Sequence, residues 1–384
     1  MNHNVCSRLS SIDWDFPGDP SESPFSAIHF HPCRFVSQVP ATLIGLLSKP
    51  GDLILDPFVG SGTTLVEAQR LGRTSVGIDL NPIAVLASKA KTIDKPISVI
   101  ASCISTLKHY AALQLSRQIN TIRATVEPKI PDSVQSAKWY VPAVADQLGR
   151  LWSLIQTLDA DSRVIAECAF SAILLSVCRE TRHWGYVCDN TMPQSNRQGD
   201  VLSEFCRALE RLDRAYRDRD AEITASGRSE SIKRATVIGG DAATVLSTYP
   251  KASVDLVLTS PPYFGVCDYI KAQRLSMEWF GITIEELRLK EIGARSKRHR
   301  GEALKEYVDG LTAVFTATRR CMKTGAYMAL VIGESAKRAG VLSELRTMFQ
   351  NLGFSLKMEI NRTVSAQRRL APSILGEHLF ILSR

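Results

Sequence analysis

The sequence lacks the features of a secreted, membrane-spanning or metal-binding chain. No apolar run approaches the ~20 residues that a membrane-spanning helix needs, and the first 19 residues contain no apolar stretch typical of a signal peptide. Nine cysteines are scattered without a C-x-x-C pair, so neither a disulfide framework nor a zinc site is indicated, and no metal is expected. We therefore predict a cytoplasmic protein whose cysteines are mostly small core residues.

Length and composition indicate a globular protein larger than one typical domain. Of the 384 residues, 45% are hydrophobic and 22% are charged, which provides ample apolar material for a core. Lys and Arg number 47 against 39 Asp and Glu, which gives a net charge of +8. This charge favours a polyanionic partner, although many proteins without such a partner carry a similar one.

One stretch, residues 53–80, organises the rest of the chain. An apolar run ends at Asp56 and enters the turn Gly60-x-Gly62, a helical pattern follows, and a second apolar run ends at Asp79. We predict a β-loop-α-β unit in which the glycines let the backbone approach a ligand and Asp79 binds ribose hydroxyls. The spacing is not the G-x-G-x-x-G of dinucleotide-binding folds, and no P-loop Lys follows. A lone Gly-x-Gly is more often a plain turn, but the preceding Asp-Pro-Phe and the following strand-end acid favour a ligand site.

The middle of the chain does not continue the strand–helix alternation. Apolar residues recur at three-to-four spacing in segments 97–123, 137–158, 162–179 and 201–223, and we predict helices there. The resulting helical insertion, residues 96–235, is either a scaffold or a module that contacts the partner. Residues 1–27 are polar and rich in Pro, Ser and Gly, and are predicted to form a loose N-terminal arm.

The alternation resumes after the insertion. Strands are expected at 236–238, 254–258, 327–332, 355–360 and 378–382, with a helix at 341–352. With the first unit they make about seven strands of a doubly wound, mostly parallel α/β sheet. No helix fits between the last two strands, so they should form an antiparallel, hairpin-like edge. The core is thus predicted to comprise residues 28–95 and 236–384.

Five segments together resemble the DNA amino-methyltransferases, which methylate exocyclic nitrogens of bases. The segments are H-x-x-P-x-R-F (29–35), D-P-F-x-G-S-G-T-T (56–64), the acid Asp79, G-D-A (240–242) and T-S-P-P-Y (259–263). The resemblance covers most of the chain outside the insertion. It implies the methyltransferase variant of the doubly wound fold, with an antiparallel edge strand, and S-adenosyl-L-methionine (AdoMet) as the cofactor.

The resemblance also implies roles for individual residues. Asp79 would hold the AdoMet ribose, and Asp241 would accept from the adenine amino group. The cofactor site as a whole would comprise His29, Pro32, Asp56, Phe58, Gly60, Gly62, Thr63, Asp79 and Asp241, and the catalytic turn Ser260, Pro261, Pro262 and Tyr263. The insertion splits the cofactor motifs, because it falls between the second and third core strands, which is not the commonest place for a target-recognition domain.

The chemistry of the Ser-Pro-Pro-Tyr turn suits an amino group. Two consecutive prolines make a stiff turn without N–H donors, and their carbonyls remain available as acceptors. An exocyclic amino group is a poor nucleophile, and acceptors aimed at its N–H bonds make it more reactive. Ser260 Oγ and the Pro261 carbonyl are the candidates, and Tyr263 would stack on the base, which is worth roughly 1–3 kcal/mol. An isolated turn of this sequence would more often simply cap a buried strand.

Ser260 in the first position resembles the N4-cytosine enzymes, and restriction–modification or defence is the expected setting. Adenine N6 is the first alternative target, because the same constellation serves both amines. An RNA base methyltransferase comes next, since tRNA guanine-N2 enzymes share this fold with an Asp-Pro-Pro-Tyr loop. A decayed, non-enzymatic DNA-binding subunit would require a damaged motif, and no motif position is damaged.

Two basic clusters are candidates for DNA contact. Residues 291–300 read EIGARSKRHR, in which Arg295, Lys297, Arg298 and Arg300 follow the catalytic turn within forty residues. The second cluster is Arg362, Arg368 and Arg369, between the last two strands. Such runs are often solvated faces, but their position favours phosphate contact. A base stacked in a duplex cannot reach such a site, so base flipping is implied.

Overall fold

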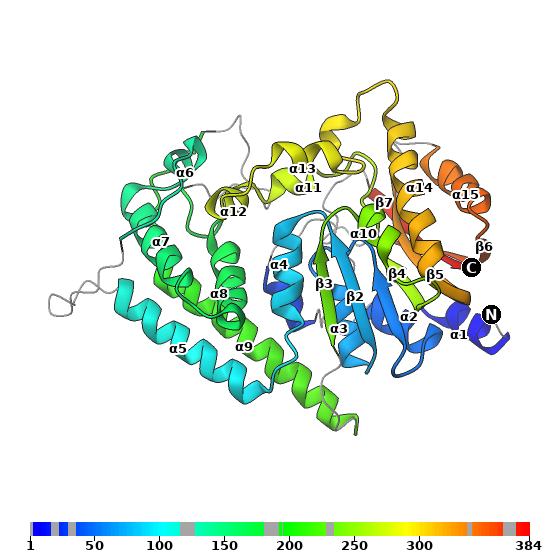
Figure 1. The fold of residues 1–384 in the computed structure, drawn as a ribbon, viewed down its shortest axis with the longest axis horizontal. Helices are drawn as coiled ribbons and strands as arrows, with labels where there is room; N and C mark the ends of the chain where they lie inside the picture. Colours follow the sequence, from blue (N-terminus) through cyan, green and yellow to red (C-terminus); the bar gives the residue numbers. More distant parts are fainter. Residues whose placement is uncertain are drawn as a thin grey trace.

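The computed structural model describes residues 3–16, 23–29, 36–115, 127–179, 192–193, 195–227, 234–335, 340–363 and 374–384. Its centre is a seven-stranded sheet with the order β3-β2-β1-β4-β5-β7-β6 (Figure 1). The strands are β1 (Leu53–Asp56), β2 (Thr74–Asp79), β3 (Ala235–Gly239), β4 (Val254–Thr259), β5 (Met322–Ser335), β6 (Ser355–Thr363) and β7 (Ile374–Ser383).

The sheet is the predicted mostly parallel one. β1 pairs in parallel with β2 and β4, β2 with β3, and β4 with β5, whereas β7 is antiparallel to both of its neighbours. The last two strands therefore form the expected antiparallel pair, with β7 inserted between β5 and the edge strand β6. The carboxyl ends of β1, β2 and β4 meet at one edge of the sheet, where a doubly wound fold binds its ligand.

Helices cover both faces of the sheet because successive strand residues point to opposite sides. Ile54 packs with α1 (His3–Ser11), α2 (Gln38–Leu47) and α3 (Thr63–Arg70). Leu55, the next residue, packs on the other face with α10 (Ala242–Thr248), α14 (Ala303–Cys321) and α15 (Val341–Asn351). Both side chains are fully buried, so β1 runs through the middle of the core.

The predicted loose arm, residues 1–27, is wrong for the described part of that segment. Leu9 of α1 is fully buried against the sheet, and Trp14 Nε1 donates to the Leu9 carbonyl at 3.0 Å. A short 3-10 helix, η1 (Pro24–Ala27), places Phe25 edge-to-face on Tyr216, with ring centroids 5.5 Å apart. Three apolar side chains among many polar ones suffice to fix the segment, because each is a large residue buried in a core.

The insertion is helical, as predicted. It contains α5 (Ile97–Leu115), α6 (Val134–Trp139), α7 (Pro142–Ile155), α8 (Ala160–Ile173) and α9 (Val201–Ala225), and lies beside α4 (Pro82–Lys91) in Figure 1. The single helix expected at 137–158 is two helices, because Tyr140 and Val141 are extended before Pro142, which starts α7. Among the described residues, no helix combines the length and apolar character needed to cross a bilayer.

The insertion shares a hydrophobic core with the sheet domain rather than standing apart. Ala87 and Ala90 of α4 and Trp279 of α12 (Arg274–Trp279) belong to the same buried cluster as the insertion's Phe170 and Phe205. The shared core means that the insertion and the sheet domain pack as one body.

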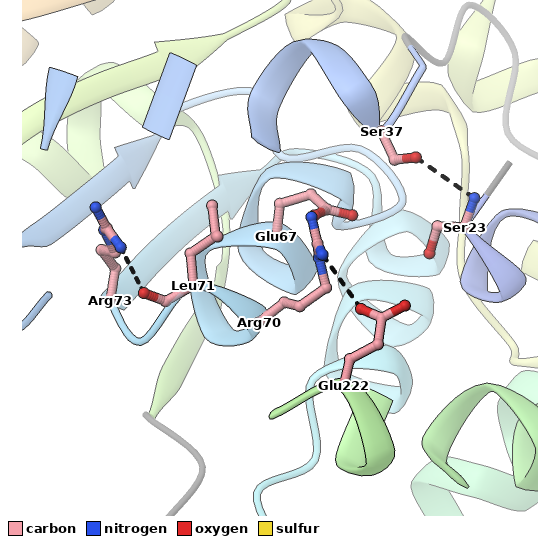
Figure 2. A network of polar contacts seen from close by, with 7 residues as sticks. All are labelled: Ser23, Ser37, Glu67, Arg70, Leu71, Arg73 and Glu222. Carbon is pink, nitrogen blue, oxygen red and sulfur yellow. Dashed lines mark hydrogen bonds and ion pairs between the residues drawn. The ribbon is translucent and has the colours of Figure 1, made fainter. Parts of the chain in front are cut away.

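A polar network also joins the insertion to the sheet domain (Figure 2). Arg70 of α3 lies 2.7 Å from Glu67 and 3.2 Å from Glu222 of α9, so one guanidinium joins the two parts. Glu67 is buried, and this burial raises the pKa of its carboxyl although Arg70 opposes the shift. Arg73 lies nearby and donates to the Leu71 carbonyl, while the Ser23 amide donates to Ser37 Oγ at 3.4 Å. The Glu67–Arg70–Glu222 contacts connect α3 to the C-terminal end of α9.

Candidate active site

The glycine loop is shaped by two residues in left-handed backbone conformations. Gly60 has φ +51° and Gly62 has φ +87°, and both positions favour glycine. A Cβ on Gly62 would lie 2.9 Å from Ser88 Oγ, and Ser88 in turn donates to the Gly60 carbonyl at 2.8 Å. The loop is therefore pressed against α4, and its outer surface faces the pocket described below.

The buried carboxyl of Asp56 and the half-buried carboxyl of Asp79 hold this loop in place. Asp56 accepts from the Phe58 amide at 3.1 Å and from Thr259 Oγ1, so it connects β1 to β4. Asp79 accepts from the amides of Gly60 and Asn81, both at 2.8 Å. Burial raises the pKa of each carboxyl to about 6. These two acids fix the loop through backbone hydrogen bonds.

The turn of residues 260–263, predicted to be catalytic and called the catalytic turn below, follows β4 directly and is held by side chains from other elements. Tyr307 of α14 donates to the Pro262 carbonyl at 3.0 Å, and Ser260 Oγ donates to the Val331 carbonyl of β5 at 3.0 Å. The Tyr263 ring is only 3% exposed, and its hydroxyl donates to Glu377 at 2.9 Å. Tyr263 thus lies against the sheet, and its proposed stacking on a base remains a prediction.

One pocket brings the glycine loop and the catalytic turn together. Of the sequence-predicted residues, it is lined by Phe58, Gly60, Thr63, Asp79, Asp241, Ser260, Pro261 and Pro262. Asp56, Gly62 and Tyr263 are not among its lining residues and lie behind it. Two stretches about 200 residues apart in the sequence therefore share one cavity.

Comparison with known proteins shows similarity to DNA methyltransferases. A family model for DNA methylases matches residues 10–90, which contain the glycine loop and Asp79. Type II methyltransferase M.MjaII of Methanocaldococcus jannaschii is 23% identical over 92% of this chain and 80% of its own length. Type II methyltransferase M.MvaI of Kocuria varians is 26% identical over 67% of this chain and 58% of its own length. The family model and the Type II relatives support the resemblance of this chain to the DNA amino-methyltransferases.

Solved structures resemble this chain more distantly. A SAM-dependent methyltransferase from Methanosarcina mazei aligns over 89% of this chain and 96% of its own, with 9% identity and a TM-score of 0.37. A Thermus thermophilus protein in complex with S-adenosyl-L-methionine covers 38% of this chain and 51% of its own, with 21% identity and a TM-score of 0.25.

The predicted position of His29 in the cofactor site differs from its position in the structure. His29 lines a separate small cavity, where its Nε2 lies 2.8 Å from Ser171 Oγ of α8. Ser171 is in turn 2.7 Å from Ser276 Oγ of α12. The imidazole therefore finds its polar partner in the insertion, which the sequence pattern could not reveal. Pro32, predicted beside it, lies outside the described residues.

Glu291 is a pocket residue that sequence reasoning missed. It follows α13 (Glu285–Lys290), is 7% exposed, and accepts from the amides of Tyr269 and Ile270 at the start of α11 (Tyr269–Ala272). Burial raises the pKa of its carboxyl to about 7. In the sequence it is merely the acid at the start of a basic run. Tyr269, Ile270, Lys290, Ile292 and Val314 also line the pocket without a sequence signal.

The segment after Glu291 is fastened to the residues that follow the catalytic turn. The Gly265 amide donates to the Gly293 carbonyl at 2.7 Å, and the Arg295 amide donates to the Cys267 carbonyl at 3.1 Å. Asp268 accepts from both the amide and the hydroxyl of Ser296, at 2.9 and 2.6 Å. The basic segment is therefore an immediate neighbour of the active site.

Its four basic residues are not equivalent. Arg295 and Arg300 are exposed, and Arg300 pairs with Glu306 at 3.2 Å. Lys297 Nζ donates to the carbonyls of Leu289 and Glu291, both at 2.8 Å, and burial lowers its pKa. Arg298 donates to the Arg295 carbonyl at 2.7 Å. To bind a phosphate, Lys297 would therefore have to break its hydrogen bonds to these two carbonyls.

The second basic cluster is wrong at the one member that the structure describes. Arg362 has a side chain only 4% exposed and pairs with Glu377 at 3.2 Å. It lies on β6, where the predicted strand ended two residues earlier, so its side chain was assigned to a loop. Arg368 and Arg369 lie outside the described residues.

Proposed function

We propose that this chain is an AdoMet-dependent DNA methyltransferase that transfers a methyl group to the exocyclic N4 of cytosine. The observation that carries this proposal is the shared pocket, which is lined both by Gly60 and Asp79 and by Ser260 and Pro261. Direct methyl transfer requires donor and acceptor in one cavity, and holding them there supplies much of the rate. Similarity to the DNA amino-methyltransferases supports DNA as the substrate.

The residues of the pocket fit AdoMet. Asp79 presents a carboxylate at the end of β2, where an acid can accept from ribose hydroxyls. Ser61 Oγ is buried in the same loop and has no hydrogen-bond partner within the described part of the chain. Asp241 lines the other side, where it also caps α10 by accepting from the Thr244 amide at 2.8 Å. When bound, AdoMet supplies an activated methyl group on a positively charged sulfur.

The chain's own contribution to the chemistry is a pair of acceptors. The hydroxyl hydrogen of Ser260 is directed toward the sheet, which leaves Oγ lone pairs for an amino group in the pocket. The Pro261 carbonyl is the second acceptor, since prolines donate nothing that would compete. A target base in duplex DNA must be flipped out of the stack to reach them.

The N4 position of cytosine is preferred over adenine N6 because Ser260 occupies the first position of the turn. Both Type II relatives are methyltransferases by name, which supports a restriction–modification setting with a cognate nuclease as partner. We propose the helical insertion as a target-recognition module. At the top of Figure 1, α11–α13 lie between the insertion and the sheet. We place the protein in the cytoplasm with its DNA.

Nucleoside mass spectrometry after reaction tests this proposal. Purified protein is incubated with AdoMet and unmethylated DNA, and the digest is analysed for methylated nucleosides. N4-methylcytosine is the expected product, N6-methyladenine would move the proposal to its alternative, and neither product would contradict both. Ser260→Ala serves as the control and should keep AdoMet affinity, measured by calorimetry, while losing most of the product.

A further inference from the structure

Behind the catalytic turn, three neighbouring strands contribute one residue each to the same row of the sheet. Glu377 of β7 is the register partner of Gly333 on β5 and of Arg362 on β6. Register partners project from the same face of a sheet. In this row β5 therefore contributes no side chain, β7 contributes a carboxylate and β6 contributes a guanidinium.

Gly333 gives Tyr263 the room to reach this row. A Cβ at position 333 would lie 2.4 Å from Tyr263 Cε2 and 2.5 Å from Cδ2, so any larger residue would displace the ring. The ring crosses β5 at this point, and the hydroxyl donates to Glu377 Oε1 at 2.9 Å. Because Gly333 has no side chain, Tyr263 of the catalytic turn can reach a carboxylate two strands away from β4.

Arg362 holds this carboxylate in place. Its Nη1 lies 3.2 Å from Glu377 Oε2, and the two side chains are 4% and 12% exposed. Each oxygen of Glu377 therefore has its own partner: Oε2 has Arg362 and Oε1 has Tyr263. An ionised carboxylate only accepts hydrogen bonds, so the Tyr263 hydroxyl has to be the donor.

The direction of the Tyr263 hydrogen bond also affects the hydroxyl of Ser260. Because Tyr263 donates its hydrogen to Glu377, its oxygen is left as an acceptor, and Ser260 Oγ lies 3.3 Å away. The Val331 carbonyl, at 3.0 Å, is the other acceptor within reach of the same hydroxyl. Both lie on the side of the sheet, so the serine hydrogen points away from the pocket.

We propose that Glu377 and Arg362 are positioning residues that, through Tyr263, act together with the Val331 carbonyl to set the direction of the Ser260 hydroxyl. The inference rests on the proposed function, because the donor that Ser260 then accepts from is the amino group of a target base. A serine hydroxyl that rotated freely would present its own hydrogen to that amino group and stop acting as an acceptor. Tyr263 accordingly acts through its hydroxyl.

Tyr263→Phe tests the chain directly, because it removes the hydroxyl and keeps both the ring and the Glu377–Arg362 ion pair. The single-turnover rate of methyl transfer should fall about tenfold, the equivalent of one hydrogen bond. The dissociation constants for AdoMet and DNA should stay within about twofold, which is under 0.5 kcal/mol. Tyr327→Phe, which lies on β5 and outside the pocket lining, is the matched control and should keep the wild-type rate.

A second variant removes the anchor without leaving a buried charge unpaired. Glu377→Leu/Arg362→Met replaces both ionic partners with apolar side chains, which proteins often tolerate. It leaves the Tyr263 hydroxyl without its carboxylate acceptor and should lower the rate with AdoMet affinity retained. A Tyr263→Phe enzyme with the wild-type rate would overturn the proposal, whether or not the double variant folds. A double variant with the wild-type rate would overturn it too.

A readout that needs no activity separates this inference from the proposed function. The Tyr263 hydroxyl proton should give a slowly exchanging NMR signal that is missing from Tyr263→Phe and shifted in the double variant. Absence of that signal from the wild-type protein overturns the hydrogen-bonded chain even if DNA is methylated. Failure of the wild-type protein to methylate DNA counts against the proposed function, while the signal still decides the chain.

Discussion

The pocket has two halves that are built in different ways. Its first half, residues 57–81, is held by backbone amides that donate to a nearby acid, as Gly60 and Asn81 do to Asp79. Its second half, from residue 241 onward, is held by side chains from distant segments. Tyr263 reaches Glu377, 114 positions away, and Pro262 is held by Tyr307, 45 positions away. The first half is specified locally, whereas the second exists only once the whole sheet has formed.

The largest expected effect is on the first half, where the backbone itself is the binding surface. Gly60→Leu places a side chain in the pocket at φ +51°, a conformation that costs a non-glycine residue about 1–2 kcal/mol. With overpacking added, AdoMet affinity should fall by about 100-fold or more, measured by calorimetry. Gly45→Leu, on the exposed side of α2 with open space around it, is the control. Unchanged affinity in a folded Gly60→Leu protein would show that the ligand does not sit on this loop.

In the second half, removing one side chain should loosen the structure around the catalytic turn. Glu291→Ala leaves the amides of Tyr269 and Ile270 without their acceptor, and unsatisfied buried groups cost about 1–3 kcal/mol. The free energy of unfolding should fall by about this amount in urea titrations, with a slower methyl transfer. Glu286→Ala, exposed on α13, should leave both unchanged. If Glu291→Ala behaved like Glu286→Ala, the second half would not depend on this carboxyl.

A pH titration distinguishes the halves by their acids. Burial raises the pKa of Asp79 from its ordinary 3.8 to about 6, so the folded protein binds this proton more tightly than the unfolded chain. Its contribution to stability is therefore present at low pH and is lost as pH rises through 6. AdoMet hydroxyls favour the ionised carboxylate, so AdoMet affinity should instead increase as pH rises through 6.

Asp79→Asn should flatten most of that increase and weaken binding by about 1.5–3 kcal/mol, the worth of a hydrogen bond to a charged group. Asp56 and Glu291, whose pKa values are also raised, to about 6 and about 7, account for the remaining slope. Calorimetry at several pH values measures both quantities. An increase of the same size in Asp79→Asn would assign the titration to the other two acids.

The smallest effect concerns DNA contact by the exposed members of the basic segment. Arg295→Ala and Arg300→Ala should each reduce the slope of log affinity against log salt by about 0.9 on duplex DNA. Lys323→Ala, an exposed lysine paired with Asp255, is the charge-matched control. Lys297→Ala should act differently and lower stability, because its ammonium group binds two carbonyls. Equal slopes for Arg295→Ala and the control would place the segment in solvent.

The sequence was sufficient for the fold and for the first half of the pocket. Strand-end acids at 56 and 79 with glycines at 60 and 62 leave few alternatives, because left-handed turns and ligand approach both require glycine. It failed where a side chain's partner is set by tertiary structure. The sequence around Glu291 gives no local signal of its bond to the Tyr269 amide. His29 contacts Ser171 of the insertion, and Arg362 is buried and pairs with Glu377 of the neighbouring strand.

The strand order has a consequence for how the protein is made. Among the described strands, β6 hydrogen-bonds only to β7, yet β6 precedes β7 in the chain. During synthesis β6 therefore leaves the ribosome with no place in the sheet, and it has to wait for β7 to enter beside β5. An unpaired strand of this kind is a site for wrong pairing with other chains. Charged side chains on β6, among them Lys357, Glu359 and Arg362, make such pairing less favourable until β7 arrives.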